Sequence, residues 1–124
     1  MTKNVFCLTL LCGLLASGAA YATECTPEEE AEAGKIAGGL VRNVAKKVMP
    51  SEGKQMINVS ACEVRGGAFT VDIKYNVLGA DGLYWVTAQT KFGAGGSNPN
   101  VKITKTSPTV AAAEAKTGVK ISSN

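Results

Sequence analysis

Apolar residues recur with two different periods along this chain, and each period predicts one kind of element. Between Pro27 and Met49 they recur every three or four residues, which gathers them on one face of a helix. This stripe comprises Ala33, Ile36, Ala37, Leu40, Val41, Val44 and Val48. Thr26 can cap the helix and Glu29 can complete a capping box. The pattern predicts a helix from Pro27 to about Met49 that packs against a core.

After Pro50 the period becomes two, which is typical of strands with one buried face. Ala68–Leu78 is the clearest case, because its apolar and polar residues alternate throughout. Its expected core face consists of Phe69, Val71, Ile73, Tyr75 and Val77. The other predicted strands are Gln55–Val64 (with Ile57, Val59 and Ala61 on one face), Leu83–Phe92 (with Tyr84, Val86, Ala88 and Phe92 on one face) and Val101–Thr106. Gly66-Gly67 and Asp81-Gly82 favour tight hairpin turns between them.

The residues after the last strand predict a short second helix. Ser107-Pro108 is a helix start, Thr109–Thr117 is rich in alanine, and Gly118 suits the position after a helix end. Two outcomes stay open for Val119 and Ile121, which either add a short edge strand or fray.

One long helix followed by a four-stranded antiparallel meander resembles the cystatin-like and NTF2-like architectural group, in which a curved sheet wraps one helix. The resemblance covers most of residues 27–106 and rests on element order. Cystatin inhibitors carry Gln-x-Val-x-Gly and Pro-Trp loops, whereas the corresponding turns here read Val64-Arg65-Gly66-Gly67 and Gly93-Ala94-Gly95-Gly96-Ser97. The resemblance therefore implies an α+β fold and transfers no inhibitory residues.

The first 22 residues have the pattern of a cleavable export signal. Lys3 is basic, Val5–Leu15 is apolar, and Ala20-Tyr21-Ala22 fits a signal peptidase. The apolar run has about eleven residues, whereas a helix that spans a bilayer needs roughly twenty. We expect one domain, Thr23–Asn124, in the periplasm or outside the cell, without stable membrane anchoring.

Removal of that signal leaves two cysteines, Cys25 and Cys62, because Cys7 and Cys12 are lost with it. An oxidising compartment favours a disulfide between them, which would stabilise the fold by about 3–4 kcal/mol. The chain has no histidine and no Cys-x-x-Cys motif. We therefore expect a structural bond, and neither a metal site nor a cofactor.

The charged residues are unevenly distributed. Without Lys3, twelve Lys and Arg residues exceed ten Asp and Glu residues by two, and five of those acids precede residue 33. The remaining basic body could meet an acidic partner. Its basic residues are scattered singly, however, apart from Lys46-Lys47, so nucleic acid is not an expected partner.

Three glycines interrupt the predicted long helix at Gly34, Gly38 and Gly39. Each costs about 1 kcal/mol relative to alanine in a helix interior, so a close approach by another backbone should compensate. We expect this neighbour to be the protein's own sheet. The alternative is a second chain, and a second copy of this one would make a homodimer.

Trp85 suggests a binding surface. If Tyr84 and Val86 face the core, Trp85 points outward with its alternate neighbours and with Lys74 of the adjacent strand. The candidate binding residues on the sheet and its hairpin loops are Leu83, Trp85, Thr87, Gln89, Lys74, Arg65, Gly95 and Gly96. Two alternatives stay open, because the C-terminal helix could cover Trp85 or the strand could have the opposite register.

Three classes of function compete. We expect a non-enzymatic module that binds another exported protein, as an inhibitor, an immunity factor or an accessory subunit. A small-ligand carrier is the alternative, with a pocket lined by Phe69, Tyr75, Tyr84 and Phe92. A hydrolase is least favoured, because without histidine its only acid–base pair would be Glu63 and Asp72.

Overall fold

The computed structural model describes residues 22–123 and shows an α+β fold, in which two helices pack against one five-stranded antiparallel sheet. The predicted export signal covers residues 1–22. All of it except Ala22 lies outside the described residues, so it stays a prediction. The elements are β2 (Thr23–Glu24), α2 (Pro27–Ala45), β3 (Lys54–Arg65), β4 (Ala68–Gly79), β5 (Gly82–Phe92), the 3-10 helix η3 (Ala94–Gly96), β6 (Asn100–Thr106) and α3 (Pro108–Thr117).

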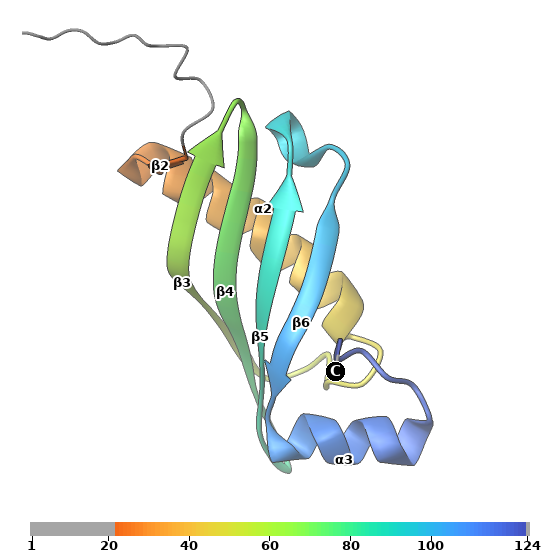
Figure 1. Ribbon diagram of the computed structural model, residues 1–124. Coiled ribbons are helices and arrows are strands. Elements are labelled where there is room, and N and C mark those ends of the chain that lie inside the picture. The colour runs from red at the N-terminus through yellow and green to blue at the C-terminus, as the bar shows by residue number, and fades with distance from the viewer. Residues whose placement is uncertain (1–21, 124) are drawn as a thin grey trace, which may run out of the picture.

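The strands lie side by side in the order β2-β3-β4-β5-β6, and α2 crosses one face of the sheet (Figure 1). The four predicted strands are present within a residue or so at each end. The predicted strand count was wrong, because β2 adds a fifth strand at the β3 edge. A strand of two residues is too short to show an alternating pattern in the sequence. It forms only by pairing with β3, with Thr23 opposite Val64 and Glu24 opposite Glu63.

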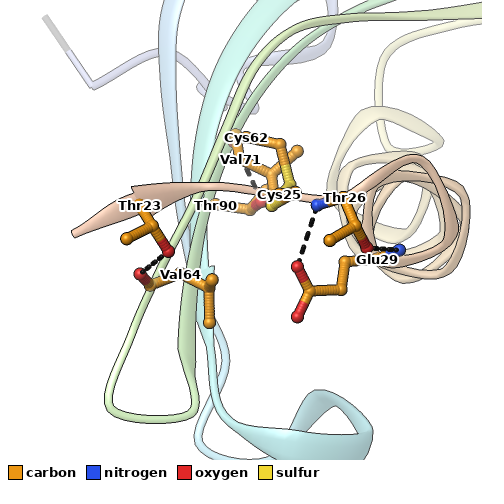
Figure 2. Close-up of a disulfide and its surroundings, with 8 residues drawn as sticks. All are labelled: Thr23, Cys25, Thr26, Glu29, Cys62, Val64, Val71 and Thr90. Atoms are coloured by element: carbon orange, nitrogen blue, oxygen red, sulfur yellow. Dashed lines mark hydrogen bonds between the residues drawn. A yellow bond between two sulfur atoms is a disulfide. The ribbon is translucent and has the colours of Figure 1, made fainter. Parts of the chain in front are cut away.

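Helix α2 begins as predicted and ends earlier. The side chain of Thr26 accepts a hydrogen bond from the Glu29 N–H, and Glu29 Oε1 accepts one from the Thr26 N–H, which completes the capping box (Figure 2). The predicted end at about Met49 was wrong, since the helix ends at Ala45. The N–H groups of residues 47 and 48 bond three residues back, so the chain tightens into a turn before Pro50.

The disulfide between Cys25 and Cys62 is present and fastens the start of α2 to β3 (Figure 2). The Cys25 N–H also donates to the Cys62 carbonyl at 3.0 Å. Beneath this link, the buried Thr90 hydroxyl donates to the Val71 carbonyl at 3.1 Å, which satisfies a polar group inside the core.

The core lies between α2 and alternate residues of β4 and β5. Four of the five residues predicted for the β4 core face are buried, and Phe69 is half-buried. Helix α2 contributes small residues to the same core: Ala33, Gly34, Ala37, Gly38, Val41 and Ala45. A Cβ on Gly34 would lie 3.0 Å from Val59 Cγ2, and one on Gly38 would collide with Ile57 Cδ1. Gly34 and Gly38 therefore admit side chains of the protein's own sheet, as we expected, whereas a Cβ on Gly39 would meet nothing within 4 Å.

A β-bulge interrupts strand β3. Val59 pairs with Ile73, whereas Ala61 pairs with Asp72, so Ser60 is the extra residue. The extra residue reverses the faces that follow it. The prediction that Ala61 shares a face with Ile57 and Val59 was therefore wrong, and Cys62 points to the core in its place.

Helix α3 and the residues after it close the lower end of the molecule in Figure 1. Ser107 caps α3 by accepting from the Val110 N–H, and Gly118 ends it with a φ of 76°. Glu114 then accepts hydrogen bonds from the N–H groups of Ile121 and Ser122, and the Ser123 N–H donates to the Ile103 carbonyl. The tail thus lies against the β6 edge, although it forms only an isolated bridge rather than a strand.

Candidate binding face

The side of the sheet that faces away from α2 carries Trp85, and we call it the open face. Strand pairing places Trp85 opposite Asn76, while its chain neighbour Val86 is fully buried opposite Tyr75. Residues directly opposite in an antiparallel pair lie on the same face. Trp85 therefore points to the open face, with Leu83, Thr87 and Gln89 at the alternate positions of β5.

Helix α3 packs on the other side of the sheet. Its Val110 is fully buried in the core, and its Ala113 lines a pocket with Tyr84 on the α2 side. The half-buried Trp85 ring instead lies beneath Lys74, whose Nζ is 4.6 Å from the ring centroid. This distance permits a cation–π interaction. Trp85 is thus held in place by a neighbour on its own face.

Three further apolar side chains lie in the same two rows of the open face as Trp85, and together the four residues form what we call the Trp85 patch: Met56, Leu78, Leu83 and Trp85. Met56 is opposite Asn76, which is opposite Trp85, and Leu78 is opposite Leu83 in the next row. The exposed fractions of Met56, Leu78 and Leu83 are 53%, 55% and 50%. Apolar side chains grouped at this exposure are typical of interaction sites, although Asn76 separates Met56 from Trp85.

Positive charge surrounds the Trp85 patch. Lys54 is opposite Leu78, and both Lys74 and Lys105 are opposite Thr87. The three rows of paired residues that contain Leu83, Trp85 and Thr87 hold these three lysines and no carboxylate on the open face. The first acidic side chain is Asp72, one row further along, opposite Gln89. The patch therefore combines apolar area with a local positive potential.

A shallow hollow of about 440 Å³ adjoins the patch. Its lining side chains on the open face are Ser60, Asp72, Lys74, Thr87, Gln89, Thr104 and Lys105. The hydroxyls of Thr87 and Thr104 lie 2.8 Å apart across β5 and β6. Three predicted binding residues, Lys74, Thr87 and Gln89, thus line one hollow next to Trp85.

The predicted loop residues lie at the other end of the sheet. Arg65 precedes the β3–β4 turn, and Gly95 and Gly96 form η3 between β5 and β6, far from α3 in Figure 1. Both glycines have positive φ, 68° and 84°, and a Cβ on Gly96 would lie 3.2 Å from Ile36 Cγ2. These residues build a tight loop over α2, and the structure does not bring them to the Trp85 patch.

The four aromatic residues considered for a ligand pocket occupy three separate places. Phe69 stacks on Phe92 with centroids 5.7 Å apart, at the end of the sheet near η3. Tyr75 donates to Gln55 at 3.0 Å, and burial raises the pKa of its hydroxyl. Tyr84 donates to Asp81 at 2.7 Å, a bond that raises its pKa as well. These contacts do not arrange the four rings around one cavity.

The two candidate carboxylates occupy the open face without facing each other. Glu63 pairs with Thr70, and Asp72 pairs with Ala61, so they lie in different rows. Among residues 22–123, no three His, Cys, Asp or Glu side chains are close enough to hold a metal ion.

Sequence reasoning missed Met56, Leu78, Lys54 and Lys105 as neighbours of Trp85. Leu78 was detectable, because the predicted Asp81-Gly82 turn would place it opposite Trp85. The turn residues are instead Ala80 and Asp81, which place Leu78 opposite Leu83 on the same face. Lys105 was not detectable, since a register shift between Thr87 and Ala88 determines its position.

No family model, curated protein or solved structure matches this chain. In the described part of the chain, neither α2 nor α3 has the length and apolar character that a membrane span requires.

Proposed function

We propose that this protein is an exported, non-enzymatic binding module that docks another protein on the Trp85 patch. The observation that carries the proposal is the group of half-exposed apolar side chains around Trp85 on a sheet face that neither helix covers. Apolar side chains left in water forgo the free energy that burial would supply. A partner that buries them would recover this free energy, with Trp85 as the anchor.

The charges around the patch indicate the chemistry of that partner. Lys54, Lys74 and Lys105 would face acidic side chains at the rim of the contact, while Leu78 and Leu83 would face apolar ones. Charge complementarity of this kind increases the rate of association and excludes basic competitors. An inhibitor, an immunity factor or an accessory subunit of an acidic exported protein fits this surface.

The proposed location follows from two features. A disulfide between Cys25 and Cys62 fits an oxidising compartment, and the first 22 residues have the pattern of an export signal. We place the protein in the periplasm or outside the cell. Its element order also supports membership of the cystatin-like or NTF2-like architectural group, with β2 as an addition.

Affinity capture from the protein's own compartment tests the proposal. The bait is residues 23–124 with the disulfide formed, and the parallel baits are Trp85→Ala and Leu83→Lys. Arg65→Ala, at the far end of the sheet, is the matched control. We expect one acidic protein to bind stoichiometrically to the wild type and to the control, and to be lost from both patch variants.

Two results would contradict the proposal. A partner retained equally by all four baits would show that another surface binds it. A small molecule that co-purifies in place of any protein would favour the ligand carrier.

A further inference from the structure

Most of the outer edge of strand β3 has no strand beside it in the part of the chain that the structure describes. Strand β2 pairs only with Glu63 and Val64, and the Cys25 N–H reaches only Cys62. From Lys54 to Ala61 the backbone groups on this side therefore have no β-partner among residues 22–123. Such an edge is a template for another strand.

This edge lacks most of the features that keep edge strands apart. Gln55–Val59 contains no charge and no proline, and the exposed fractions of Met56 and Ile57 are 53% and 40%. Its one protective feature is the bulge at Ser60, which ends the regular run at Val59. The opposite edge of the sheet differs, because the tail residue Ser123 bonds to Ile103 of β6.

We propose that the β3 edge pairs with the same edge of a second copy of this chain, antiparallel, about a two-fold axis at Ile57. Opposite residues must share a face, so this axis places Ile57 opposite Ile57, Met56 opposite Asn58, and Gln55 opposite Val59. All of these positions precede the bulge. No like charges face each other, and the exposed isoleucines bury one another.

Helix α2 supplies the reason for a second copy rather than an unrelated strand. It follows the β3 edge, since Gly34 approaches Val59, Gly38 approaches Ile57, and Arg42 lines one pocket with Gln55. A groove of about 430 Å³ between helix and edge is lined by Pro27, Glu30, Ala31, Gly34, Lys35, Ile57 and Val59.

The two ends of α2 carry opposite charge, with Glu28, Glu29 and Glu30 in its first turn and Arg42 in its last, while Lys35 lies between them beside the groove. The two-fold axis runs the two helices antiparallel, which turns the acidic end of each toward the basic end of the other. A second copy, which carries the same opposite charges at its helix ends, therefore complements both ends at once. The pairing also leaves both open faces on the same side of one continuous sheet, so a dimer would present two Trp85 patches in parallel.

Sedimentation equilibrium of residues 23–124 over a range of concentrations tests the dimer. We expect twice the monomer mass for the wild type. Ile57→Lys should raise the dissociation constant of the dimer about a hundredfold, because each copy loses one buried isoleucine and two like charges meet at the axis. Leu83→Lys is the control and should not change it, although it should abolish partner capture. The two variants thus distinguish failure of the dimer from failure of the proposed function.

Cysteine cross-linking decides the geometry, even if Ile57→Lys fails to fold. Ile57→Cys should form a disulfide between two copies, because directly opposite residues of an antiparallel pair have Cα atoms about 4.5–5.5 Å apart, which a disulfide can span. Lys102→Cys on β6 should not. A wild type that is monomeric at every concentration, or a dimer that cross-links through residue 102 and not through residue 57, would overturn the proposal.

Discussion

Ile73 and Lys74 are neighbours in β4, yet they serve opposite faces of the sheet. Ile73 is 2% exposed beneath α2, whereas Lys74 lies in water above the Trp85 ring. On the covered face, apolar side chains are buried and contribute directly to stability. On the open face, Leu78 and Leu83 remain half-exposed at some cost in free energy. The difference teaches that the covered face holds the fold together, while the open face is available for binding.

The largest effect should come from breaking the disulfide that fastens α2 to the covered face. Changing Cys25 and Cys62 together to Ser should lower the free energy of unfolding by about 4 kcal/mol, because the bond closes a loop of 37 residues. Urea unfolding followed by circular dichroism measures this change. A loss below about 1 kcal/mol would show that the start of α2 stays in place without the bond.

Truncation on the two faces should give unequal losses. Ile73→Ala removes a buried side chain and should cost about 3 kcal/mol. Lys74→Ala should cost less than about 1 kcal/mol, since it removes only an exposed cation–π contact. Equal losses in urea unfolding would remove the contrast between the faces.

The glycines of α2 should respond with opposite signs. Gly38→Leu should destabilise by about 1–3 kcal/mol, because the added side chain collides with Ile57. A Cβ on Gly39 meets nothing within 4 Å, so Gly39→Ala should stabilise by about 0.5–1 kcal/mol through helix propensity. Thermal melts of both variants measure the two signs. If Gly38→Leu were as stable as the wild type, the close contact between α2 and β3 would be wrong.

The tail should be the region most sensitive to acid. Partial burial works to raise the pKa of Glu114, but hydrogen bonds from Ser122 and Ile121 outweigh it and lower the pKa below its ordinary value. A carboxyl group whose pKa is lower in the folded state contributes to stability. This contribution is complete above the unfolded-state pKa and is lost as the pH falls through the folded-state pKa. The protection of the Ile121 and Ser122 amides against hydrogen exchange, taken relative to their intrinsic rates at each pH, should therefore fall in acid.

Glu114→Gln is the matched control for the tail. The glutamine side chain cannot titrate, so the protection of these two backbone amides should be lower at neutral pH and should lack the additional loss in acid. An unchanged pH profile in Glu114→Gln would show that another group controls the tail.

The sequence predicted features that depend on neighbours along the chain. The capping box at Thr26, the cap at Ser107 and the alternation of β4 are local patterns, and all three are confirmed. With two cysteines left after the signal, the disulfide had one connectivity, and it is also confirmed. These features follow from residue type and spacing, which a single sequence displays.

Features that depend on distant partners were missed. Strand β2 forms because β3 provides a strand for it to pair with. The bulge at Ser60 turns Ala61 to the face opposite the one that simple alternation predicts. The tail depends on Glu114, whose partners lie seven and eight residues away. The Trp85 patch needed the registers of three strands at once, and only Leu83 and Trp85 of its four members were named from the sequence.

The most direct test of the division between the two faces compares Trp85→Ala with Val86→Ala, adjacent residues of β5 that point to opposite sides. We predict that Val86→Ala lowers the free energy of unfolding by about 2–3 kcal/mol, because Val86 is fully buried. Trp85→Ala should lower it by no more than about 1 kcal/mol, since the ring is half-buried and its identified partner is Lys74. A loss in Trp85→Ala as large as that in Val86→Ala would make Trp85 a structural residue and would contradict the open face as a binding surface.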